Sequence, residues 1–204
     1  MSTSCIYGFY KNGVLKVDYN NSDSYPRGFG KSVVGFIREN SLEELQELYE
    51  KIVVVPRKES PSEEQLKELK KNNMYLDFST DEGFNWEIIS LCNDKFLEYY
   101  QKGVYFMPDF TEWFYAGQEW VYLINLDDNV FEIYKGKYTH TYVADSILEE
   151  INRYKEKYEL LAQFDLSNVP KDWYLAPLGW RWRRYLDMKK APRGVREGRN
   201  RESP

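Results

Sequence analysis

Residues 119–135 have the sequence EWVYLINLDDNVFEIYK, which carries the clearest fold signal in the chain. The segments 119–126 and 130–135 predict two strands, and the turn residues Asp127-Asp128-Asn129 between them predict a β-hairpin. The first strand is apolar on both of its faces rather than on one. A strand of this kind is covered on both sides, so we expect helices above and below the sheet.

A second hairpin is predicted near the start of the chain. Residues 7–10 and 14–19 flank Asn12-Gly13, a pair that accepts positive φ at both turn positions. Helical periodicity and start signals, including a Ser41/Glu44 capping box, predict the remaining elements. The expected helices cover residues 31–39, 41–52, a short stretch from Pro61, 84–101 and 143–162, and an irregular segment follows from Asp165. The order predicts an α+β fold, with an antiparallel sheet or sheets sandwiched by helices.

Length and composition set limits on the class of protein. The 204 residues, 42% of them hydrophobic, suit one globular domain over residues 1–178, followed by a separate segment, 179–204. No apolar run approaches the roughly 20 residues of a membrane span, and the start does not resemble a signal peptide. We therefore expect a cytoplasmic protein without membrane contact. Two cysteines exclude a disulfide scaffold, and the single His140 excludes a multi-histidine metal site, so no metal or cofactor is expected.

Charge is distributed unevenly along the chain. Residues 1–178 hold 19 basic and 30 acidic side chains, a net −11, whereas residues 179–204 hold 9 basic and 3 acidic, a net +6. The basic segment opens with five candidates for nucleic-acid contact, in which tryptophans would stack between arginines. These residues are Trp180, Arg181, Trp182, Arg183 and Arg184. The alternative is that its aromatic rings pack on the domain and a disordered tail follows.

The polar segment between the first hairpin and the first helix is the main candidate for ligand binding. Its glycines precede a helix start, where free amide groups can hold an anion. Basic side chains add positive charge, and an aromatic ring could stack on a base. The candidate residues are Tyr25, Arg27, Gly28, Gly30 and Lys31. The alternative is a turn whose polar side chains bond only their own backbone.

Cys5 and the segment Asn20-Asn21-Ser22-Asp23 resemble the cysteine N-terminal-nucleophile hydrolases, such as bile-salt hydrolases and acid-ceramidase-like amidases. In that family a mature chain beginning with cysteine passes through a hairpin to an Arg-Asn-x-Asp segment. The resemblance implies an αββα sandwich and amide hydrolysis. It also implies Cys5 as nucleophile, with Asn20 or Asn21 and Asp23 as orienting and oxyanion groups. Asn20 occupies the family's arginine position, and cleavage after Ser4 would be needed to free the amino group that acts as base.

A longer resemblance is to uncharacterised accessory proteins of phages and bacteria of similar length. It rests on residues 7–13 and 19–26 and on the second hairpin over residues 119–136. It implies an accessory role that counteracts host defence by binding a small anionic or nucleotide-like ligand, or a host protein. The sequence leaves three hypotheses open: this binding module, the cysteine amidohydrolase, and nucleic-acid binding through the basic segment.

Overall fold

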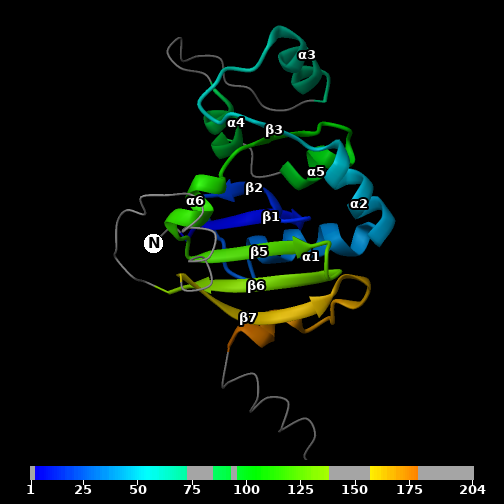
Figure 1. Ribbon diagram of the computed structural model, residues 1–204, viewed down its shortest axis with the longest axis vertical. Coiled ribbons are helices and arrows are strands. Elements are labelled where there is room, and N and C mark those ends of the chain that lie inside the picture. Colours follow the sequence, from blue (N-terminus) through cyan, green and yellow to red (C-terminus); the bar gives the residue numbers. More distant parts are fainter. Residues whose placement is uncertain (1–2, 73–84, 93–95, 138–156, 179–204) are drawn as a thin grey trace, which may run out of the picture.

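Two β-hairpins form the centre of the fold. In this computed structural model, which describes residues 3–72, 85–92, 96–137 and 157–178, both predicted hairpins are present (Figure 1). Their antiparallel strands are β1 Cys5–Lys11 with β2 Val14–Asn20, and β5 Trp120–Asn125 with β6 Val130–Gly136. Asn12 and Gly13 have φ values of 52° and 76°. These positive values are those of the tight turn that suits the twist of a two-residue hairpin.

The two hairpins join through a parallel pair, which the sequence analysis did not predict. The five-stranded sheet has the order β2-β1-β5-β6-β7, and β1 runs parallel to β5. Both are the first strands of their hairpins, and β5 is buried at every position. The two buried strands lie side by side in the sheet with a parallel register from Cys5/Trp120 to Tyr10/Asn125. The crossover that parallel strands require is supplied by the helices between them, so the sheet is mixed rather than antiparallel.

The fifth strand corrects the expectation of a helix over residues 143–162. Residues 143–156 lie outside the described part of the chain, but β7 Tyr158–Asp165 pairs antiparallel with β6. An irregularity of register near Leu161 lets the strand present apolar side chains to both faces of the sheet. Apolar residues on two faces resemble the pattern of a helix. The segment forms a strand because the edge of β6 offers it backbone hydrogen bonds.

Helices and a small second sheet complete the structure. Two helices begin with the capping boxes Ser41/Glu44 and Ser62/Gln65, so Pro61 precedes its helix instead of starting it. The expected helix over 84–101 consists of two described helices, and residues 93–95 between them are outside the described part. The elements are α1 Phe29–Glu39, α2 Leu42–Lys51, α3 Glu63–Lys71, α4 Trp86–Cys92, α5 Phe96–Gln101, α6 Thr111–Ala116, the 3-10 helices η1 Leu166–Asn168 and η2 Trp173–Leu178, and the parallel pair β3 Val53–Val55 with β4 Phe106–Pro108.

The large sheet has a core on each face. Tyr7 and Tyr122 belong to the larger core, which α1, α2, α4 and α5 cover. Val121 belongs to the smaller core on the other face, with Phe110 and Phe114 at α6. Figure 1 shows α1 behind the sheet and α6 in front of its left end. Helices therefore contact both faces of the sheet, and the α+β class is confirmed.

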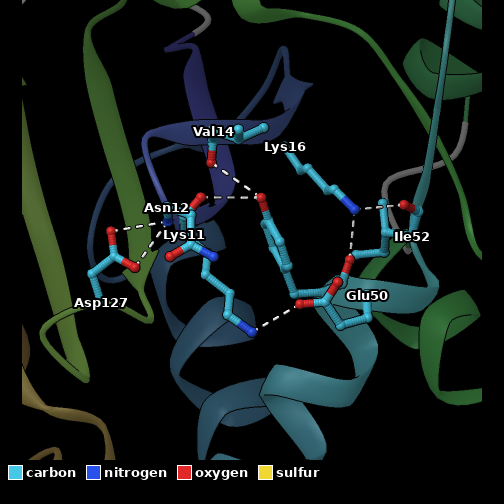
Figure 2. Close-up of polar contacts among 8 residues, drawn as sticks. Lys11, Asn12, Val14, Lys16, Glu50, Ile52 and Asp127 are labelled. Carbon is cyan, nitrogen blue, oxygen red and sulfur yellow. Dashed lines mark hydrogen bonds and ion pairs between the residues drawn. The ribbon is translucent and has the colours of Figure 1, made fainter.

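The turn end of the first hairpin is held by α2 and by the second hairpin (Figure 2). Lys16 Nζ donates to the carbonyl oxygens of Tyr49 and Ile52 at 2.7 and 2.8 Å, where α2 ends. The Asn12 amide donates to the carboxylate of Asp127 at 2.9 Å. Asp127 is thus the turn residue that the sequence indicates, and these contacts fix one end of the sheet. The candidate site lies at the opposite end, where β1 begins.

Candidate functional site

Ser24 anchors the loop that follows β2. Its side chain is fully buried. Its amide donates to Thr3 Oγ1 at 3.1 Å, and its carbonyl accepts from the Tyr122 hydroxyl at 2.7 Å. Its own hydroxyl accepts from Asn20 Nδ2 at 2.8 Å. The backbone and side chain of Ser24 therefore connect the loop to Thr3, just before β1, and to β2 and β5.

The loop conformation depends on a close approach between Asp23 and Gly28. Asp23 has a φ of 45°, in the left-handed region. A Cβ on Gly28 would collide with the carbonyl and carboxyl groups of Asp23. Glycine is therefore required at position 28 for steric reasons, and the loop has a defined shape before any ligand arrives.

The amide groups at the start of α1 are already hydrogen-bonded. Gly28 and Gly30 donate to the carbonyl of Tyr25 at 2.9 and 3.2 Å, and Phe29 donates to the carbonyl of Asp23 at 2.8 Å. Lys31 donates to the carbonyl of Gly28 at 2.9 Å. An anion held by these amides, as the sequence analysis expected for Gly28 and Gly30, would have to displace loop carbonyls. Side chains remain as the accessible binding groups.

Tyr25 is the exposed aromatic residue of this loop. Its side chain is 46% exposed, and its ring meets the ring of Trp120 edge-on at 6.4 Å between centroids. Trp120 stacks on Tyr122 and lies 4.4 Å beneath Lys135 Nζ, which also pairs with Glu119 at 2.8 Å. Among the described residues, the buried indole Nε1 of Trp120 has no hydrogen-bond acceptor. Tyr25 thus contacts an aromatic cluster in which the indole N–H of Trp120 can still donate a hydrogen bond.

Arg27 and Lys31 provide the positive charge, and both are exposed. The Arg27 guanidinium lies 5.1 Å from the ring centroid of Tyr174. Gly30 allows Trp173 of η2 to pack here, because a Cβ at that position would lie only 3.0 Å from the Trp173 ring. The structure therefore brings η2 against the loop, and Arg27 is supported by an aromatic ring that the sequence analysis did not connect to it.

Cys5 lies beneath this loop and is fully buried. The hairpin register places it opposite Asn20. Burial raises the pKa of the Cys5 thiol to about 12, the nearby Asp18 adds to this, and hydrogen bonding by Ser24 and Asn20 only partly offsets it. The thiol is protonated at neutral pH, whereas the thiolate is the reactive form. The nitrogen of Cys5 is part of the peptide bond with Ser4, so it is not a free amino group. The carbonyl of Ser4 accepts a hydrogen bond from the Trp120 amide at 3.2 Å.

Asp18 is a buried carboxylate that the sequence analysis missed. It accepts from the Tyr7 hydroxyl at 3.0 Å, the Ser90 hydroxyl at 2.6 Å and the Tyr19 amide at 2.7 Å. Burial raises its pKa to about 6, although these hydrogen bonds favour the charged form. The Asn12-Gly13 turn sets a register that pairs Tyr7 with Asp18. The hairpin register could therefore have placed Tyr7 beside Asp18. No sequence pattern places Ser90, on α4, beside Asp18.

A small crevice opens above this buried cluster. Its space, about 10 Å³, suits no more than a water molecule. Asn21 is exposed at its rim, and Asp23 is exposed farther along the loop. The structure thus brings Cys5 and Asn20 together but leaves Asn21 and Asp23 at the surface. The lining residues are Tyr7, Tyr19, Asn20, Asn21, Phe29, Ser90 and Leu91.

Several residues named in the sequence analysis lie outside the described part of the chain. The nucleic-acid candidates Trp180, Arg181, Trp182, Arg183 and Arg184 lie outside, as does His140. Within the described ranges, no group of three or more histidine, cysteine, aspartate or glutamate side chains could hold a metal ion. No helix in the same ranges combines the length and apolar composition of a membrane span.

Comparison of the chain with protein-family models, with curated proteins and with solved structures found no match.

Proposed function

We propose that the protein binds a small planar anion, of the size and charge of a nucleotide, through Tyr25, Arg27 and Lys31. The observation that carries this is the anchoring of Ser24, which holds an exposed aromatic ring and a cation in place on a rigid loop. A recognition loop ordered in advance loses less entropy on binding, so more of the contact energy becomes affinity.

Each side chain has a distinct role in this proposal. Tyr25 offers a ring face for stacking, which contributes about 1–3 kcal/mol per base in comparable sites. Arg27 presents a planar guanidinium suited to two-pronged contact with a phosphate. Lys31 adds a second charge in the first turn of α1. Because the α1 amides are occupied, binding through side chains predicts moderate affinity and a clear salt dependence.

Binding without turnover would serve to withhold the ligand from other proteins. The resemblance to phage and bacterial accessory proteins supports this role, since such a protein would act in the cytoplasm of the host against a small-molecule defence signal. A host protein seated on the same loop is the competing occupant. If the loop binds a host protein instead, no small ligand should change the melting temperature of the protein.

A thermal-shift screen of nucleotides and other small anions tests this function. A ligand at about 100 times its dissociation constant would stabilise the fold by roughly 2.7 kcal/mol. Arg27→Ala should abolish the shift, and Lys67→Ala, an exposed lysine on α3, is the matched control. Absence of any shift across the screen, or conversion of the ligand to product, would contradict the proposal.

A second candidate is amide hydrolysis with Cys5 as an N-terminal nucleophile. The specific observation in its favour is the register that places Cys5 beside Asn20, with Ser24 close to both. Cleavage after Ser4 would free the amino group that serves as base, and the αββα layering would require a second stacked sheet. Intact mass of the untagged protein tests it: a mass that begins at Cys5 supports hydrolysis, and a mass that retains Ser2 excludes it.

A further inference from the structure

Two grooves meet on the helical side of the molecule. The first, of about 330 Å³, lies between α1 and α5, which pack against each other. The second, of about 250 Å³, lies between α2 and α5. Gln101 lines both, and it donates to Glu39 at 3.0 Å on the ridge between them. We call this continuous surface the α5 trench.

The floor of the α5 trench is apolar in part. Phe36 and Leu97 lie under the first groove, whose exposed lining is polar and apolar in similar measure, and Leu48 and Tyr100 lie under the second, whose lining is mainly polar. The space beside Gly35 in the first groove is open, because a Cβ there would meet no atom within 4 Å. The first groove can therefore receive an apolar side chain from a partner beside polar contacts.

The rim of the α5 trench is acidic. Glu39 and Glu98 line the first groove, and no basic side chain is among its described lining residues. Glu44 and Glu47 line the second, where the lysine present, Lys51, pairs with Glu47 at 3.3 Å. Hydrogen bonds from the amide and hydroxyl of Ser41 lower the pKa of Glu44, so it stays ionised. The rim of the trench therefore carries net negative charge.

We propose that the α5 trench is a docking surface for a basic peptide segment of a partner protein, in which arginine or lysine alternates with apolar side chains. Charge complementarity selects this occupant: four carboxylates face one paired lysine, so an acidic or neutral segment gains no electrostatic attraction. An apolar side chain of the segment occupies the first groove, and its cations pair with the carboxylates of the rim. The trench begins beside the Tyr25 loop, at Phe29, but Tyr25, Arg27 and Lys31 are not among its lining residues, so this inference does not depend on the proposed function.

A fluorescent synthetic peptide in which arginine alternates with leucine tests the proposal by anisotropy against the full-length protein. We expect saturable binding at low ionic strength that weakens as salt is added. The same peptide with glutamate in place of arginine should not bind. Absence of saturable binding by the arginine peptide would overturn the proposal.

Two variants assign the binding to the trench. Glu39→Lys combined with Glu98→Lys should weaken binding at least tenfold, whereas Glu59→Lys, an exposed acid elsewhere, should leave it unchanged. Gly35→Leu should weaken binding similarly by filling the first groove. Its melting temperature should not fall, because the space at Gly35 is open and leucine favours helix. Equal weakening by Glu59→Lys, or full binding by Gly35→Leu, would show non-specific attraction and overturn the assignment.

Discussion

The hydroxyl of Tyr122 donates a hydrogen bond to the carbonyl of Ser24 at 2.7 Å, across 98 positions of the chain. This contact connects the centre of the sheet to the loop that carries Tyr25 and Arg27. It explains why a polar surface loop has a defined shape, and it links the fold to the proposed binding function.

Removing that hydroxyl should weaken both stability and binding. Tyr122→Phe leaves a buried carbonyl without its donor, which costs about 1–3 kcal/mol of unfolding free energy. The loop also loses an anchor, so affinity for the anionic ligand should fall. Urea unfolding and calorimetric titration measure the two effects. Tyr10→Phe, a partly exposed tyrosine on the other face of the sheet, is the matched control, and equal losses in both variants would count against the anchoring role.

Asp18 should make the protein more stable in mild acid than at neutral pH. Its pKa is about 6 in the folded chain, against an ordinary value of 3.8, so the folded state binds the proton more tightly. The associated stability is complete below about pH 4 and is lost as the pH rises through 6. At 1.36 kcal/mol per pKa unit, the change is on the order of 3 kcal/mol.

The Asp18→Asn variant isolates this effect, because asparagine does not titrate. Unfolding free energies measured by urea from pH 4 to pH 7.5 should fall in the parent protein. In the variant the fall should be smaller by the contribution of Asp18. Parallel profiles for the two proteins would show that Asp18 does not carry the pH dependence.

The Cys5 thiol should resist alkylation in the folded protein. Burial and a pKa near 12 keep it protonated and inaccessible. Treatment with iodoacetamide at pH 8, followed by peptide mapping, should find Cys5 unmodified until denaturant is added. Rapid labelling of the native protein would instead indicate an accessible thiolate and would favour the hydrolase candidate.

Two glycines should respond in opposite directions to alanine. Gly28→Ala forces a Cβ against Asp23 and should cost about 1–3 kcal/mol, as overpacking does. Gly35→Ala adds a methyl group to open space within α1 and should stabilise by about 0.4–1 kcal/mol. Urea unfolding of the two variants provides the comparison. Equal stability of the two would contradict the close approach at Gly28.

The parts of the fold that depend on neighbouring residues were predictable. The turn at Asn12-Gly13 and the capping box at Ser41 involve groups within a few positions, and both hold in the structure. The parallel pairing of β1 with β5 depends on contacts across more than one hundred residues, which local periodicity does not encode. The strand β7 was mistaken for a helix because a register irregularity gave it apolar side chains on both faces.

The candidate site divides in the same way. The hydrolase resemblance implied a group of Cys5 with Asn20, Asn21 and Asp23; the hairpin register pairs Cys5 with Asn20, whereas Asn21 and Asp23 are exposed. The anchoring of Ser24 by Tyr122 and the bond from Ser90 to Asp18 join segments 98 and 72 positions apart, so no spacing rule could identify them. The anion site expected at the α1 amides was not found, because carbonyl oxygens of the loop itself accept the hydrogen bonds of those amides.

Calorimetric titration of the nucleotide giving the largest thermal shift, into the full-length protein and into Tyr25→Ala and Arg27→Ala, tests the central claim most directly. The account predicts one saturable site in the parent protein, with affinity reduced about tenfold or more in each variant. It also predicts unchanged affinity in Lys67→Ala. Parent-like affinity in both loop variants would place the ligand elsewhere and contradict the assignment of the loop as the binding site.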